Sequence, residues 1–115
     1  MKKEYRICKN YEFSSIIHKQ NLVKSSSFVC YYLPKKEQHN RIGISVSKKL
    51  GNAVCRNKIK RQVRSMVDLV FDFEEAFDVV IIVRPVYKKK TFGENCNELK
   101  ENREKMKRKC KEKRG

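Results

Sequence analysis

The sequence predicts a small α+β protein in which helices pack on a mixed sheet. Two segments have the short β-branched and aromatic pattern of strands, residues 28–33 and 77–85, and a long amphipathic segment with a helical period lies between them. The chain has 115 residues, which suits one domain with a single core. We expect the order α-β-β-α-β-α over residues 1–115.

The first expected element is a short helix. Asn10 is a suitable N-cap, and the helical pattern continues to about Gln20. Its apolar residues share one inner face: Phe13, Ile16 and Ile17. The polar run at residues 24–27 then separates this helix from the first strand.

Two strands are expected next. Residues 28–33, FVCYYL, are aromatic and β-branched, and Pro34 ends the run. Residues 41–47, RIGISVS, alternate apolar residues with smaller or polar ones, which indicates a half-buried strand. We expect these two strands to pair antiparallel.

The segment at residues 48–64, KKLGNAVCRNKIKRQVR, carries the strongest functional signal. It contains seven Lys or Arg and no Asp or Glu. Asn52 is a suitable N-cap for a helix that runs to about Phe71. Apolar residues at helical spacing define its buried face: Ile59, Val63, Met66, Val67 and Val70.

A polar flank adjoins this buried face. At about 100° per residue it gathers Asn57, Lys60, Arg61 and Arg64. Exposed helices usually mix charge signs and gain support from opposite charges four residues apart. An acid-free surface is instead suited to placing fixed charges against a polyanion, and an ordinary solvated face is the simpler alternative.

The rest of the chain predicts one strand and one helix. Residues 77–85, FDVVIIVRP, form the most hydrophobic segment and predict a central strand stopped by Pro85. A helix is expected from about Glu94, and the basic segment at residues 95–115 is expected to fray. Its apolar stripe is thin and is interrupted by Arg103: Cys96, Leu99, Met106 and Cys110.

Charge limits the function classes. Lys and Arg number 29 against 13 Asp and Glu, a net charge of +16, which favours nucleic acid or an anionic membrane as the partner. The longest apolar run, residues 79–83, is far shorter than the roughly 20 residues that span a bilayer. The N-terminus lacks the apolar core of a signal peptide, so we expect a cytoplasmic protein with no membrane partner.

The sequence predicts no disulfide framework and no zinc site. Its five cysteines are odd in number, widely spread and never in a C-x-x-C arrangement: Cys8, Cys30, Cys55, Cys96 and Cys110. We expect them to be reduced and mostly packed, with Cys96 and Cys110 the candidates for exposure.

No catalytic or protein-borne metal site is predicted. His18 and His39 lie far apart in sequence and have no evident ligand partners, and no small-molecule substrate is expected. An acidic cluster could suggest a divalent metal, although solvated acids at a helix end are the simpler interpretation: Asp68, Asp72, Glu74, Glu75 and Asp78.

Aromatic side chains could stack on unpaired bases. In the first strand, alternate residues share a face: Phe28, Cys30 and Tyr32 lie on one, and Val29, Tyr31 and Leu33 lie on the other. One face must pack on the helices, so at most one set is available to a ligand. The pattern does not decide which.

The central block, RIGISVSKKLGNAVCRNKIKRQVR, closely resembles the signature of the bacterial ribonuclease P protein subunit. That family pairs R-x-G-x-x-V-S-K-K-x-G-N-A-V with R-N-x-I-K-R-x-x-R. Sixteen positions match: Arg41, Gly43, Val46, Ser47, Lys48, Lys49, Gly51, Asn52, Ala53, Val54, Arg56, Asn57, Ile59, Lys60, Arg61 and Arg64. The likeness extends over roughly residues 4–87, and departures include Lys58 and Ile17, where the family often has Arg and an aromatic residue.

The resemblance implies an unusual left-handed β-α-β crossover. It also implies a protein that binds the catalytic RNA of ribonuclease P and the 5′ leader of precursor tRNA. The RNA and its Mg²⁺ ions would then cleave the phosphodiester bond, with no catalytic residue in this chain. A structural, ribosomal-type RNA-binding protein with no part in tRNA cleavage is the alternative.

By the same resemblance, two sets of residues are expected to contact RNA. The expected RNA-binding residues are Lys48, Lys49, Asn52, Arg56, Asn57, Lys58, Lys60, Arg61 and Arg64. The expected lining of a central cleft for the single-stranded leader is Phe13, Ile17, Val29 and Tyr31.

Overall fold

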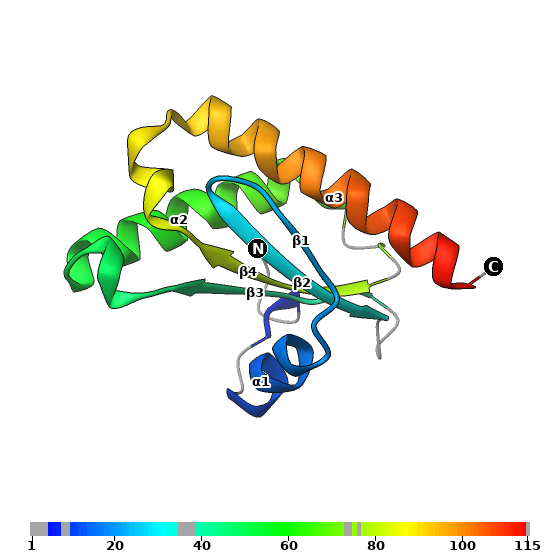
Figure 1. The fold of residues 1–115 in the computed structure, drawn as a ribbon. Helices are drawn as coiled ribbons and strands as arrows, with labels where there is room; N and C mark the ends of the chain where they lie inside the picture. The colour runs from blue at the N-terminus through cyan, green and yellow to red at the C-terminus, as the bar shows by residue number, and fades with distance from the viewer. Residues whose placement is uncertain (1–4, 8–9, 35–38, 73–74, 76, 115) are drawn as a thin grey trace.

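A computed structural model describes residues 5–7, 10–34, 39–72, 75 and 77–114, in which three α-helices pack on a four-stranded sheet (Figure 1). The α+β class is confirmed. In chain order the helices and strands are α1 (Asn10–His18), β1 (Leu22–Lys24), β2 (Phe28–Pro34), β3 (Ile42–Val46), α2 (Ala53–Val70), β4 (Phe77–Val83) and α3 (Phe92–Arg114). Two short 3-10 helices are η2 (Lys48–Leu50) and η3 (Pro85–Lys89).

The strand order is β1-β2-β4-β3, and this corrects the expected pairing of β2 with β3. β4 lies between them, antiparallel to β2 and parallel to β3. Nearly all of β4 is buried, as expected for an apolar strand that has neighbours on both edges. The short β1 was not foreseen, because only Val23 of its three residues is buried.

The parallel strands β3 and β4 are joined through α2, and this is the unit for which the resemblance implies a left-handed crossover. In Figure 1 both strands point the same way, α2 lies behind them, and α1 lies below the sheet. The left-handed sense, which runs against the usual rule for such units, stays a prediction from the resemblance.

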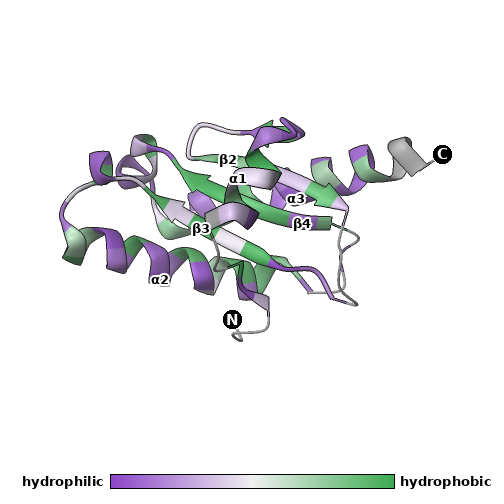
Figure 2. Cartoon of the chain, turned by 90° about the horizontal axis from the view of Figure 1, so that it is seen from below, coloured by the Kyte–Doolittle hydropathy of each residue, from purple (hydrophilic) through white to green (hydrophobic). Residues whose placement is uncertain are grey.

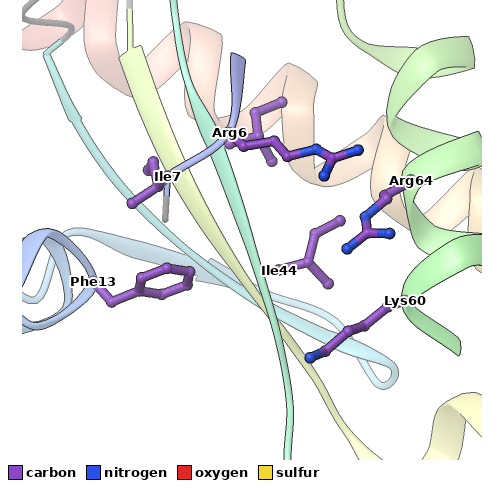
Figure 3. Close-up of a pocket in the computed structure, with 7 residues that line it drawn as sticks. Arg6, Ile7, Phe13, Ile44, Lys60 and Arg64 are labelled. Carbon is purple, nitrogen blue, oxygen red and sulfur yellow. The ribbon is translucent and has the colours of Figure 1, made fainter. Parts of the chain in front are cut away.

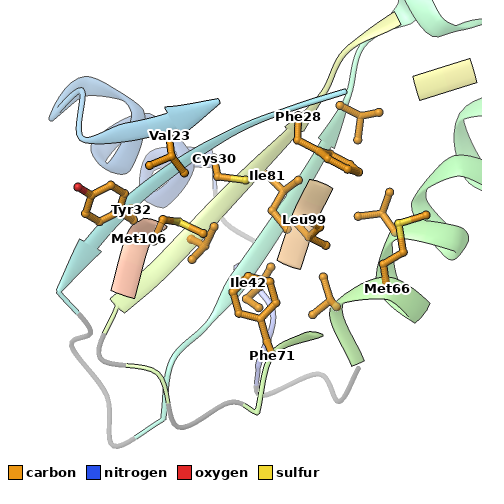
Figure 4. Packing of buried hydrophobic residues seen from close by; sticks show 14 of the residues in the cluster. Val23, Phe28, Cys30, Tyr32, Ile42, Met66, Phe71, Ile81, Leu99 and Met106 are labelled. Carbon is orange, nitrogen blue, oxygen red and sulfur yellow. The ribbon is translucent and has the colours of Figure 1, made fainter. Parts of the chain in front are cut away.

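The main core lies between the sheet and the pair α2 and α3 (Figure 4). From β2 it takes Phe28, Cys30 and Tyr32, which are at most 3% exposed. Burial raises the pKa of the Cys30 thiol to about 12. Figure 2 shows hydrophobic colouring along β2 and β4, whereas α2 alternates between hydrophilic and hydrophobic residues.

Helix α2 confirms its expected bounds and its expected buried face. The Asn52 side chain accepts a hydrogen bond from the backbone N–H of Cys55 at 3.0 Å, which caps the first turn. The residues that pack against the sheet and α3 are Ile59, Val63, Met66 and Val67, with Val70 partly buried. Helix α1 begins at Asn10 and ends at His18, two residues before the expected end, and the expected capping by Asn10 lies outside the described side chains.

Helix α3 begins at Phe92, two residues before the expected start. Thr91 and Glu94 form a reciprocal capping box, in which each backbone N–H donates to the other side chain. These bonds hold the pKa of the Glu94 carboxyl below its usual value. The helix continues to Arg114, and fraying of its last turns stays a prediction.

The interior face of α3 contains polar groups as well as the expected stripe. Arg103 interrupts the stripe because it pairs with Glu75, with 2.7 Å between Arg103 Nε and Glu75 Oε2. Cys110 is 6% exposed, so the expectation that it could be exposed is wrong, while Cys96 is partly buried.

Cys8 and Glu74 lie outside the described residues. Within the described part of the chain, no helix is long and apolar enough to cross a membrane.

Candidate nucleic-acid interface

The second face of the sheet is only partly covered. Helix α1 packs on β2 and β4, where Ile7, Ile16 and Val80 form a small buried cluster. Partly exposed apolar side chains surround it: Phe13, Ile17, Tyr31, Leu33 and Ile82. Val29 alternates with the buried Phe28 and Cys30 and is also half-buried on this face. The four expected cleft residues therefore lie on the same, more open face.

Gly43 explains how Phe13 approaches the sheet. A Cβ atom at residue 43 would lie 2.6 Å from Phe13 Cζ and 2.8 Å from Phe13 Cε1. Such distances are too short for any real side chain, so the ring of Phe13 occupies space that only glycine leaves free. The glycine of the central block thus allows α1 to approach the sheet closely.

Arg41 ties the same helix to the sheet. Its guanidinium forms an ion pair with Glu12 of α1. Its backbone N–H donates to Asp78 Oδ1 at 2.8 Å, at the start of β4. Asp78 is 3% exposed, so this buried carboxylate is compensated by a hydrogen bond and a nearby cation. Arg41 therefore helps to hold α1 in place on the open face of the sheet.

A pocket of about 310 Å³ connects this face to the basic helix (Figure 3). Its apolar lining comes from Ile7, Phe13, Ile42 and Ile44, and its cations from Arg6, Lys60 and Arg64. In Figure 3 Ile44 lies between Phe13 and the two α2 cations, and the Arg6 side chain points toward Arg64. A pocket of this kind offers an aromatic ring and phosphate-binding charges to the same ligand.

The expected RNA-binding residues divide by position. Lys60 and Arg64 line the pocket, and Arg56 is partly buried. The others of the helix are exposed on its outer surface: Asn57, Lys58 and Arg61. Lys48 and Lys49 are exposed on η2, whereas the Asn52 side chain is engaged in capping α2.

Two cations were not singled out from the sequence: Arg6, which lines the pocket, and Lys88, which contacts the chain just before α2. Arg6 lies in a short segment that runs beside β3, where Ile7 N–H donates to the Ile42 carbonyl at 3.1 Å. Lys88 Nζ donates to the Leu50 carbonyl at 3.1 Å, just before α2. A single Lys or Arg outside a periodic pattern gives no sequence signal that would predict either contact.

The acids that could have suggested a metal site have other partners. Glu75 pairs with Arg103, and Asp78 accepts the Arg41 hydrogen bond. Among the described residues, no group of three or more His, Cys, Asp or Glu side chains has an arrangement suited to a metal ion.

Fold and site together define an α+β protein with a cationic, partly apolar pocket suited to single-stranded nucleic acid. Residues 1–112 match the family model described as Ribonuclease P. The chain is 46% identical over 101 residues to the ribonuclease P protein component of Mesoplasma florum, covering 86% of this chain and 92% of the relative. The chain belongs to the ribonuclease P protein family.

Solved structures agree. A mutant of the Staphylococcus aureus RNase P protein superposes with a TM-score of 0.80 at 42% identity, covering 91% of this chain and 90% of that one. The Thermotoga maritima RNase P protein gives 0.69 at 27% identity, covering 82% and 90%. The protein is thus an RNA-binding subunit of ribonuclease P, the ribonucleoprotein endonuclease of tRNA processing.

Proposed function

We propose that the protein binds the catalytic RNA through the exposed cations of η2 and α2 and holds the 5′ leader of precursor tRNA on the open face of the sheet. The observation that carries the proposal is the pocket in which Phe13 and the cations Lys60 and Arg64 face one cavity. An unpaired base can stack on the ring while its phosphates meet the cations.

This chemistry suits a subunit that must accept many leaders. Phosphate contacts from Lys and Arg supply affinity without reading sequence, and stacking is tolerant because every base has a π-face. Cleavage itself is assigned to the RNA and the Mg²⁺ ions that it binds. The cations beside the leader screen repulsion between substrate and RNA, which lowers the Mg²⁺ concentration required.

We also propose a cytoplasmic location for the complex. The four described cysteines are free thiols, which suits a reducing compartment.

The test is multiple-turnover cleavage of a precursor tRNA at low Mg²⁺, with a bacterial ribonuclease P RNA alone, the protein alone, and both together. Cleavage at the mature 5′ end only in the mixture supports the proposal. An unchanged Mg²⁺ requirement in the mixture contradicts the screening role, and cleavage by the protein alone contradicts catalysis by RNA.

A matched pair of variants tests the pocket. Arg64→Gln removes a pocket cation, whereas Lys100→Gln removes an exposed cation from α3. We expect Arg64→Gln to weaken binding of a precursor with a leader more than binding of mature tRNA, and Lys100→Gln to affect neither. An equal loss for both RNAs would contradict leader binding in the pocket.

A further inference from the structure

Helix α3 is divided by charge. Residues 92–104 contain four acids and two bases, whereas residues 105–114 contain seven bases and one acid. No acid occurs from Lys105 to Lys111. This second basic segment lies outside the central block, and the open face of the sheet makes no use of it.

Three of the four acids of the first half have structural partners. Glu94 completes the capping box with Thr91, and Glu98 pairs with Lys90 at 2.6 Å. Glu104 pairs with Arg103 at 3.1 Å. These contacts explain why acids gather in this half of the helix.

The cations from Lys105 to Lys109 have no such partners among the described side chains. Lys105, Arg108 and Lys109 are exposed, and Lys107 is partly buried. The helix dipole favours cations, but its effect is confined to the last turn, whereas Lys105 lies nine residues before Arg114. Lys105 and Lys109, four residues apart, repel each other on the helix surface.

The helix nevertheless holds these cations in fixed positions. Met106 and Cys110 are 0% and 6% exposed in the main core, so the backbone that carries Lys105, Arg108 and Lys109 is anchored to the sheet. Cations on an anchored helix keep a fixed arrangement, unlike the cations of a mobile tail, and a fixed arrangement is suited to a folded polyanion.

We propose that the exposed cations from Lys105 to Lys109 form a second phosphate-binding surface, which contacts the backbone of the catalytic RNA. The inference rests on the proposed function. The long axis of the molecule measures 41 Å, and the amino end of α2 and the carboxyl end of α3 lie at opposite ends in Figures 1 and 2. Helix α3 also packs on the face of the sheet away from α1.

These positions indicate which RNA contacts the α3 surface. A leader bound on the α1 face lies on the opposite side of the sheet from α3, whereas a large folded RNA that meets the amino end of α2 can also reach α3. The contact is to phosphates, because Lys offers point charges that read no base sequence.

The experiment measures binding of a bacterial ribonuclease P RNA to the full chain as a function of salt. The double variant Lys105→Gln/Lys109→Gln is compared with Lys19→Gln/Lys100→Gln, which removes two other exposed cations. Losing two phosphate contacts should reduce the slope of log K against log salt by about 1.4–1.8, and should weaken binding ~10- to 30-fold at 0.15 M salt. The control pair should change binding less than about threefold.

Two further variants separate the possible outcomes. Lys105→Arg/Lys109→Arg keeps the charge and should keep the slope, and thermal unfolding of each variant confirms an intact fold. Lys58→Gln/Arg61→Gln tests the surface of α2. Weak binding by the α2 pair with normal binding by the α3 pair overturns this inference alone, and equal losses for the α3 and control pairs overturn it in favour of bulk charge. A mixture that fails to cleave precursor tRNA contradicts the proposed function instead.

Discussion

The two faces of the sheet differ in how completely they are covered. One face lies beneath α2 and α3 and encloses most of the core. Among the described residues, the other carries α1 and Ile7 and keeps apolar side chains partly exposed. Strand β2 serves both faces, because its alternate residues point to opposite sides. Neighbouring residues of this one strand therefore have different roles, one in stability and the next in ligand binding.

Two adjacent tyrosines give the largest test of this comparison. Tyr32 is 3% exposed in the main core, and Tyr31 is partly exposed beside α1. Tyr32→Ala should lower the free energy of unfolding by about 3–5 kcal/mol. Tyr31→Ala should cost about 1–2 kcal/mol in stability, but weaken leader binding by ~1–3 kcal/mol. Urea unfolding and leader-dependent tRNA binding measure the two effects, and equal stability losses would contradict the assignment.

Gly43 offers a sharper test of the open face. Gly43→Ala places a Cβ in the space of the Phe13 ring and should cost about 1–3 kcal/mol in stability, with a parallel loss of leader affinity. If the effect acts through the ring, Phe13→Ala should abolish most of the additional cost of Gly43→Ala. A double-mutant cycle measures this coupling, and strict additivity would show that the clash lies elsewhere.

The covered face has a contact that depends on pH. Burial alone raises the pKa of the Glu98 carboxyl, but hydrogen bonds from Lys90 and from the backbone N–H of Ser27 lower it to about 2. The unfolded value is 4.5, so the stability that Glu98 contributes is complete above pH 4.5 and is lost as the pH falls toward 2.

Glu98→Gln should therefore destabilise the protein by about 1–3 kcal/mol at neutral pH. The gap between the variant and the parent should narrow below pH 4.5, as measured by urea unfolding at several pH values. A gap that is constant from pH 7 to pH 2.5 would contradict the ion pair.

Asn52 gives the smallest expected effect and separates two roles. Asn52→Ala should cost about 1 kcal/mol by removing the cap of α2, whereas Asn52→Ser keeps a capping oxygen and should stay close to the parent. Thermal unfolding and RNA binding are measured together. If Asn52→Ser is stable but binds RNA weakly, the amide contacts RNA as well as capping the helix.

The elements whose ends are set by local chemistry were predicted most accurately. The cap at Asn52 and the apolar spacing of α2 fixed both ends of that helix. The capping box at Thr91 and Glu94 is equally local but was not predicted, and α3 begins two residues before its expected start. Strand pairing is not local: β4 separates β2 from β3, and no pattern within residues 28–47 records that.

The site shows the same division. The cations of α2 were recognisable from the sequence because they repeat on one helix without acids. The choice of the Tyr31 face over the Tyr32 face came from the family resemblance, because both faces of β2 are apolar. Arg6 joins the pocket through a tertiary contact beside β3, which has no counterpart in its own neighbourhood of the chain.

The central place of β4 has a consequence for synthesis on the ribosome. Residues 77–83 are made after β2, β3 and α2, yet β2 and β3 contact each other only through them. A nascent chain that has emerged only as far as α2 therefore displays its basic helix before β3 has a partner strand. The pocket can assemble only after β4 has been made. RNA that meets the emerging chain earlier therefore encounters the cations of α2 before the pocket exists.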